Sequence, residues 1–138
     1  MPLQLATDMR DKLNGLTEQI IGAALAVHRQ LGPGMLERAY ELCLAFEFGE
    51  RGLMVECQKP LPLVYRGVRM DCGYRVDLLV EGLVVVEVKA IERLERVHSA
   101  QVLSYLRMLK LQVGLVINFN VQWLVRDGVR RIVNDFPE

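Results

Sequence analysis

The sequence predicts an α+β domain in which a mixed, mostly antiparallel sheet is flanked by helices. Two hydrophobic patterns support this class. Apolar residues recur every three or four positions near both ends of the chain, which is typical of helices, whereas β-branched and polar residues alternate in its middle, which is typical of strands. The 138 residues hold neither a repeat nor a linker and suffice for one core. We expect one domain over residues 1–138, with 1–12 and 134–138 frayed.

Three segments carry the helical pattern, at about 13–31, 36–51 and 97–110. In the first segment Leu16, Ile20 and Val27 share one face. Gly32-Pro33-Gly34 then breaks this helix before the second one begins.

Strand patterns cover 54–58, 61–65, 68–72, 76–80, 84–89, 111–117, 121–125 and 129–133. Pro60 and Pro62 restrict the first two segments to an edge or to irregular pairing, because proline cannot donate to a sheet. Because 68–72 leads into the hairpin strand at 76–80, the expected order is two helices, four strands, one helix and three strands.

The composition excludes several classes of protein. The formal net charge is zero, which argues against strong non-specific binding to phosphate backbones. The three cysteines lack zinc-ligand spacing, so we expect reduced thiols in the cytoplasm. Neither a signal peptide nor an apolar run of membrane-spanning length is evident, and we expect no association with a membrane.

Three charges stand in the most apolar part of the chain, the predicted hairpin at 75–90. They are Asp77, Glu87 and Lys89, and their neighbours are largely valine and leucine. Unpaired charges are costly in such surroundings. The cost of burying these charges is offset if the two carboxylates and the lysine together hold a divalent cation.

The hairpin register decides whether these side chains meet. A two-residue turn at Glu81-Gly82 would place Asp77 opposite Val86 and turn Glu87 to the other side of the sheet. We therefore expect an odd-length loop, residues 80–82, or a bulge. Asp77 then pairs with Val85, and Glu87 lies at the diagonal position on the same face.

The spacing Asp77-x9-Glu87-x-Lys89 resembles the motif of the PD-(D/E)XK nuclease superfamily, although Val76 replaces the proline that often precedes the aspartate. Residues 34–40, Gly-Met-Leu-Glu-Arg-Ala-Tyr, resemble the signature of the small GxxExxY proteins within it. The resemblance implies a restriction-endonuclease-like core and a nuclease dependent on Mg²⁺ or Mn²⁺. It also implies nucleic acid, either DNA or RNA, as substrate.

The resemblance further implies roles for individual residues. Asp77, Glu87 and the Val88 carbonyl are expected to bind the metal, and Lys89 to assist the attacking water. Glu37 would add a third carboxylate from a helix, directly or through water. The spacing Gln101-x-x-x-Tyr105 resembles a motif that lines the site and positions DNA in exonuclease-type members. We also expect nucleic-acid contacts from Arg75, Arg93 and His98.

Plainer interpretations compete with these roles. Asp77 and Lys89 can form a simple ion pair while Glu87 is solvated, and Gln101 and Tyr105 can be a buried polar pair. The whole chain can also be an inactive module of the same fold that binds nucleic acid or a protein partner. No segment is left over for a sequence-reading domain, so specificity should come from substrate structure, homo-oligomerisation or a partner.

Overall fold

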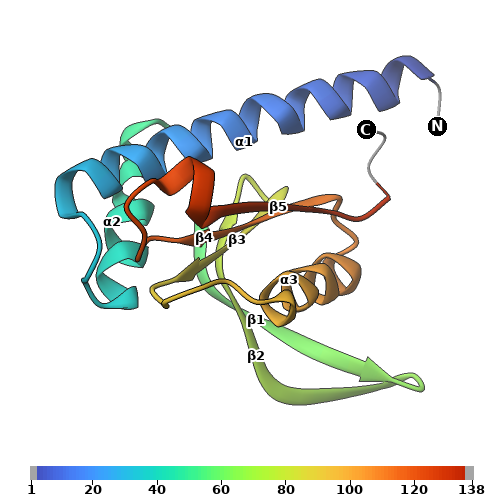
Figure 1. Cartoon of the computed structure of the whole chain (residues 1–138). Coiled ribbons are helices and arrows are strands. Elements are labelled where there is room, and N and C mark those ends of the chain that lie inside the picture. Colours follow the sequence, from blue (N-terminus) through green and yellow to red (C-terminus); the bar gives the residue numbers. More distant parts are fainter. Residues whose placement is uncertain (1–2, 136–138) are drawn as a thin grey trace.

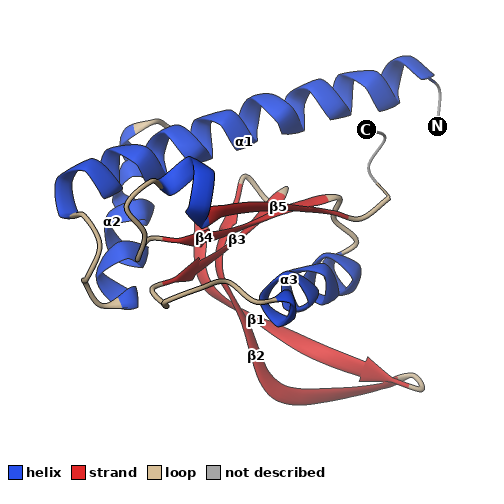
Figure 2. Ribbon diagram, viewed as in Figure 1, coloured by secondary structure: helices blue, strands red, loops and turns tan. Residues whose placement is uncertain are grey.

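The computed structural model describes residues 3–135, and the fraying expected at 1–2 and 136–138 lies outside them. Its helices and strands follow one another along the chain as shown in Figures 1 and 2: α1 (Leu3–Leu31), α2 (Glu37–Glu50), β1 (Val55–Tyr65), β2 (Val68–Val80), β3 (Val84–Lys89), α3 (Arg96–Leu109), β4 (Val113–Asn118), the π-helical turn η1 (Leu124–Gly128) and β5 (Val129–Val133).

The five strands form one mixed sheet whose spatial order, β1-β2-β3-β4-β5, is also their order in the chain. β1 and β2, β2 and β3, and β4 and β5 pair antiparallel. β3 and β4 pair parallel, because α3 lies between them in the chain and returns it to the same end of the sheet. The predicted α+β fold with a mixed, mostly antiparallel sheet is confirmed.

Helices cover both faces of this sheet (Figure 2). On one face, Ile20 of α1 and Leu44 of α2 belong to the same core as Val86 of β3. On the other, Leu106 of α3 shares a core with Val85. β3 and β4 are therefore apolar on both sides, which explains their nearly continuous runs of valine, leucine and isoleucine.

The hairpin of β1 and β2 extends beyond the body of the domain as an arm, residues 59–75, that reaches past α3 (Figure 1). Its register shifts midway, because Leu61 pairs with Tyr74 whereas Leu63 pairs with Met70. β2 therefore has two extra residues here. Such bulges bend a strand.

Three sequence-based boundaries were wrong. α1 begins at Leu3 rather than near residue 13. Segments 54–58 and 61–65 form the single edge strand β1, and 68–72 and 76–80 form the single strand β2, because pairing along the arm continues across the local breaks.

The strand expected at 121–125 does not form; the chain instead turns through η1. At the end of this turn Gly128 packs closely, since a Cβ atom there would lie 2.3 Å from the carbonyl oxygen of Asn118. No helix within residues 3–135 is long and apolar enough to cross a membrane.

Candidate active site

The turn between β2 and β3 has an odd length, as expected. Val80 pairs with Val84, so the loop consists of residues 81–83 rather than 80–82. The predicted register was consequently wrong by two residues, and Leu79 rather than Asp77 lies opposite Val85. Because the register differs by an even number of residues, every side chain still points to the predicted face of the sheet. The last pair on this side is Leu78 with Val86, so Asp77 is level with Glu87.

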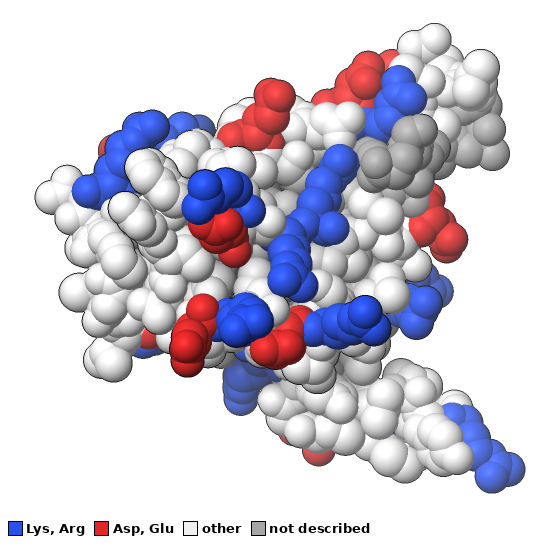
Figure 3. Space-filling model, viewed as in Figure 1, with Lys and Arg blue, Asp and Glu red and all other residues white. Residues whose placement is uncertain are grey.

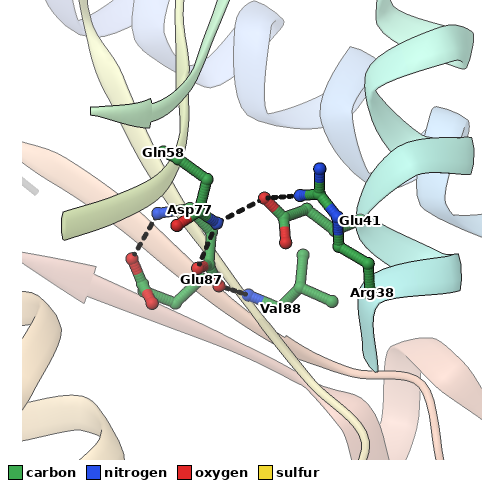
Figure 4. A network of polar contacts seen from close by, with 6 residues as sticks. All are labelled: Arg38, Glu41, Gln58, Asp77, Glu87 and Val88. Atoms are coloured by element: carbon green, nitrogen blue, oxygen red, sulfur yellow. Dashed lines mark hydrogen bonds and ion pairs between the residues drawn. The ribbon is translucent and has the colours of Figure 1, made fainter. Parts of the chain in front are cut away.

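Asp77 makes two hydrogen bonds across the strands, one to Glu87 and one to Val88, shown in Figure 4. The Asp77 N–H donates to Glu87 Oε1 at 2.9 Å, and the Val88 N–H donates to Asp77 Oδ2 at 2.9 Å. Each carboxylate thus accepts a backbone donor of the opposite strand where the regular pairing of β2 and β3 has ended. This exchange fixes the positions of both side chains.

Burial, and after it the negative charge of Asp77, raise the pKa of Glu87 from its ordinary 4.5 to about 8. The hydrogen bond from the Asp77 backbone and the charge of Lys89 act against this rise. Only 3% of the Glu87 surface is exposed. The Glu87 carboxylate is therefore a group whose charge a bound cation would stabilise.

A third acidic residue, Glu41 of α2, is linked to Asp77 through Gln58 of β1. Gln58 Nε2 donates to Glu41 Oε1 at 2.6 Å and to Asp77 Oδ1 at 3.2 Å (Figure 4). Arg38 Nη1 also lies 3.2 Å from Glu41 Oε1. Glu41 is buried, so α2 does bring a carboxylate to the neighbourhood of Asp77.

Sequence reasoning missed Glu41 and Gln58 as site residues. Glu41 lies one helical turn after Glu37 on the same face, which was the available signal. The sequence contained no comparable signal for Gln58, because Gln58 reaches the site only through the pairing of β1 with β2. Its φ of +52° places it in the left-handed region, which is uncommon outside glycine.

Glu37 itself is exposed in the first turn of α2. Within residues 3–135 its side chain makes neither a hydrogen bond nor an ion pair. Its predicted place near the metal, directly or through water, stays a prediction.

Gln101 and Tyr105 lie one turn apart on α3, and Gln101 Nε2 donates to the Tyr105 hydroxyl at 2.9 Å. Burial raises the pKa of Tyr105, and the charge of Glu87 is the next cause. Tyr105 therefore lies close enough to Glu87 to sense its charge. The role of Gln101 and Tyr105 as a wall of the site stays a prediction.

Lys89 ends β3, and Phe119 N–H donates to its carbonyl at 2.9 Å. The charge of Lys89 lowers the pKa of Glu87, which places its side chain within electrostatic reach of that carboxylate. Throughout the described part of the chain, Lys89 makes no ion pair. The plain Asp77–Lys89 ion pair is thus not formed, and Glu87 is buried rather than solvated.

The three residues expected to contact nucleic acid lie in different settings. His98 Nδ1 accepts the Glu95 N–H at 2.8 Å and so caps α3. Arg75 is exposed on β2, and Arg93 is exposed in the loop before α3. Both arginines are free of ion pairs among residues 3–135, so both can meet a ligand.

The donor set fits a hard divalent cation held largely by water. Residues 3–135 contain no group of three histidine, cysteine, aspartate or glutamate side chains placed as metal ligands. Asp77 and Glu87 nevertheless supply two carboxylates, and Mg²⁺ is commonly bound by one or two carboxylates together with waters and substrate phosphates. The part expected of the Val88 carbonyl stays a prediction.

A mixed sheet with an acidic pair and a lysine between flanking helices defines a nuclease-like domain. A family model described as the PD-(D/E)XK nuclease superfamily matches residues 14–132, and the chain belongs to that superfamily. Nucleases of this superfamily generally use divalent metals, and their substrate is nucleic acid. Neither a curated protein nor a solved structure matches the chain.

Proposed function

We propose that this chain is a nuclease that hydrolyses phosphodiester bonds of DNA or RNA with the help of Mg²⁺ or Mn²⁺. The observation that carries the proposal is the buried contact between Asp77 and Glu87, with the unpaired Lys89 following on the same strand. Such an arrangement costs stability and has no evident structural use. Perturbed acidic groups of this kind mark functional sites.

In this proposal Asp77 and Glu87 hold the cation, together with the Val88 carbonyl. When bound, the cation supplies polarisation of the phosphate and an acidified water. The Lys89 ammonium stabilises the negative charge that develops on the scissile phosphate or orients the attacking water. Gln101 and Tyr105 position the strand from α3.

The third carboxylate in this proposal is Glu41 rather than Glu37. Glu41 is buried and shares the Gln58 amide with Asp77, whereas Glu37 is exposed. Glu41 can reach the metal through a water or keep Gln58 in place. Either role needs Gln58 to join α2 to the sheet.

We also infer that the chain is a GxxExxY protein, from Gly34, Glu37 and Tyr40. Tyr40 supports this, because its hydroxyl donates to the Gly32 carbonyl and accepts the Met35 N–H at 3.1 Å. The tyrosine thereby holds the loop that leads into α2. Its ring stacks on Phe119 with centroids 4.6 Å apart.

A non-catalytic module that binds nucleic acid or a protein partner is the second candidate. The observation in its favour is that no third acidic side chain joins Asp77 and Glu87 within residues 3–135 as a ligand group. In that case the acidic pair serves to bind a cation or to fix the hairpin.

A cleavage screen separates the two candidates. Single-stranded, duplex and branched DNA and RNA are incubated with the protein in Mg²⁺ or Mn²⁺, with EDTA as the metal-free control. The nuclease proposal predicts cleavage that is lost in Lys89→Ala and retained in Lys12→Ala, a change at an exposed lysine of α1. Activity that survives in Lys89→Ala points to a contaminant or to another site, and the proposal then fails.

A further inference from the structure

A pocket of about 410 Å³ opens between the arm and α3. Leu63 and Tyr74 form its wall on the arm. The α3 wall includes the polar side chains of Gln101, Ser104 and Tyr105. An apolar pocket with a few converging polar groups is the usual form of a binding site for an organic ring.

Tyr105 relates the pocket to the acidic pair. Tyr105 lines it, and the charges of both Glu87 and Asp77 raise the pKa of this tyrosine. Gln101, which also lines the pocket, is hydrogen-bonded to the Tyr105 hydroxyl. A ligand in the pocket contacts the two α3 residues, Gln101 and Tyr105, that the proposed function assigns to positioning the strand.

Tyr74 is presented to this pocket by the bulge in the arm. It directly follows Gly73, whose φ of +78° and N–H bond to Asp71 Oδ1 at 3.1 Å shape the bulge. The Tyr74 ring meets Tyr105 edge to face, with centroids 6.1 Å apart, and is 41% exposed. An aromatic ring so placed offers a stacking surface beside the polar groups of α3.

The arm also concentrates positive charge in a chain whose net charge is zero. Between residues 59 and 75 it has one acidic side chain, Asp71, and four basic ones: Lys59, Arg66, Arg69 and Arg75. Lys59 pairs with Glu56, whereas the three arginines are without ion pairs inside the described range. Figure 3 shows basic side chains at the far end of the arm. Phosphates of a strand crossing the arm would meet these cations.

We propose that the pocket takes one unpaired nucleobase of the substrate strand, stacked on Tyr74, while the arginines of the arm contact the neighbouring phosphates. The substrate is then a single strand, or the unpaired segment of a frayed or branched duplex, because a base held in a duplex cannot enter a pocket. This inference rests on the proposed nuclease function for the position of the scissile phosphate.

Binding is tested without cleavage, in EDTA, by the fluorescence anisotropy of a labelled oligothymidylate and of a blunt duplex of equal length. We expect tighter binding of the single strand. Tyr74→Ala should weaken it by about tenfold, which is within the range for loss of one base–aromatic stack, and Tyr74→Phe should retain it. Tyr65→Ala is the matched control, since Tyr65 is an exposed aromatic residue of the same arm outside the pocket.

A second variant tests the pocket without removing the stacking ring. Ala100 lines the pocket at an exposed position of α3, so Ala100→Trp fills the space without disturbing the core. We expect it to weaken binding of the oligothymidylate as Tyr74→Ala does. Wild-type affinity in both variants, or equal affinity for the blunt duplex, overturns the proposal.

Cleavage of the same oligonucleotides in Mg²⁺ is measured in parallel, with Lys89→Ala. Binding that depends on Tyr74 without cleavage that depends on Lys89 supports the pocket and defeats the nuclease function. Cleavage that depends on Lys89, with unchanged binding in Tyr74→Ala and Ala100→Trp, supports the nuclease function and defeats the pocket.

Discussion

The carboxylates of Glu41 and Asp77, one from α2 and the other from β2, accept hydrogen bonds from the same side-chain nitrogen, Gln58 Nε2. Arg38 offsets the charge of Glu41, and the Val88 N–H offsets that of Asp77. Two like charges held by one neutral donor would otherwise repel each other. Gln58 is thus the connection between the helix and the acidic pair of the sheet.

Replacing Gln58 with Leu should lower the free energy of unfolding of the metal-free protein. The change keeps a side chain of similar size but leaves buried Glu41 without its amide donor, which costs about 1–3 kcal/mol. Urea unfolding in EDTA measures the loss. Gln112→Leu is the matched control, because its side chain makes only a long bond, 3.5 Å, to the Asp135 carbonyl.

The double variant Gln58→Leu/Glu41→Leu sharpens this test. Removing both polar partners avoids the unsatisfied acceptor, so part of the lost stability should return. If the double variant is no more stable than Gln58→Leu alone, the bridge is not the source of the loss.

Millimolar Mg²⁺ or Mn²⁺ should raise the thermal midpoint of the wild type and leave that of Asp77→Ala unchanged. An ion that binds only the native state stabilises it by mass action, by about 2.7 kcal/mol at a concentration one hundred times its Kd. Asp11→Ala, at an exposed position of α1, should respond like the wild type. A wild-type midpoint that is insensitive to either ion would remove the basis for a metal site at Asp77 and Glu87.

The hairpin shows what sequence patterns determine and what they leave open. The need to bring Asp77 and Glu87 together predicted an odd loop, and the loop is odd. Alternation defines the two faces of a strand but not the partner of each residue, so registers two residues apart satisfy it equally. The actual register depends on tertiary packing, for instance of Val86 against both helices of its face.

The same limit applies to α2 and to the segment after β4. Helical periodicity identified the face that holds Glu37 and Glu41, but not which of its turns meets the sheet. Gln58 depended on pairing with a distant strand, which local patterns do not encode. Residues 121–125 alternate like a strand, but the chain turns through η1 there, because tertiary context overrides local β-propensity.

Substituting Gly114 with Ala should destabilise the domain. A Cβ atom there would lie 2.6 Å from Val102 Cγ1 and 3.3 Å from the Val85 carbonyl oxygen, so the packing of α3 on β4 must adjust. Overpacking of this kind costs about 1–3 kcal/mol. Gly15→Ala is the matched control: nothing lies within 4 Å of the added methyl group, and the loss of helix-interior glycine should stabilise α1 by about 0.5–1 kcal/mol. Urea unfolding measures the free energy of unfolding of both variants. If Gly114→Ala leaves this free energy unchanged, α3 can shift freely.

Glu87 should make the metal-free protein less stable as the pH rises from about 4.5 to about 8. Its pKa is raised to about 8 in the folded state by burial and by Asp77. Between the unfolded and folded pKa values the native state binds the extra proton, so the free energy of unfolding falls with increasing pH. The contribution is fully present below the unfolded pKa and is lost by the folded one, and it amounts to roughly 2–4 kcal/mol.

Glu87→Gln removes the titrating group but keeps its size and its acceptor oxygen for the Asp77 N–H. In EDTA, we expect the wild type to lose stability relative to Glu87→Gln across this window, while Glu92→Gln, an exposed control, follows the wild type. Because a cation competes with the proton on Glu87, the stabilisation by Mg²⁺ should also grow with pH. The prediction fails if the difference in free energy of unfolding between wild type and Glu87→Gln stays constant from pH 5 to about 8. Glu87 would then stay ionised throughout, with Lys89 rather than a proton balancing its charge.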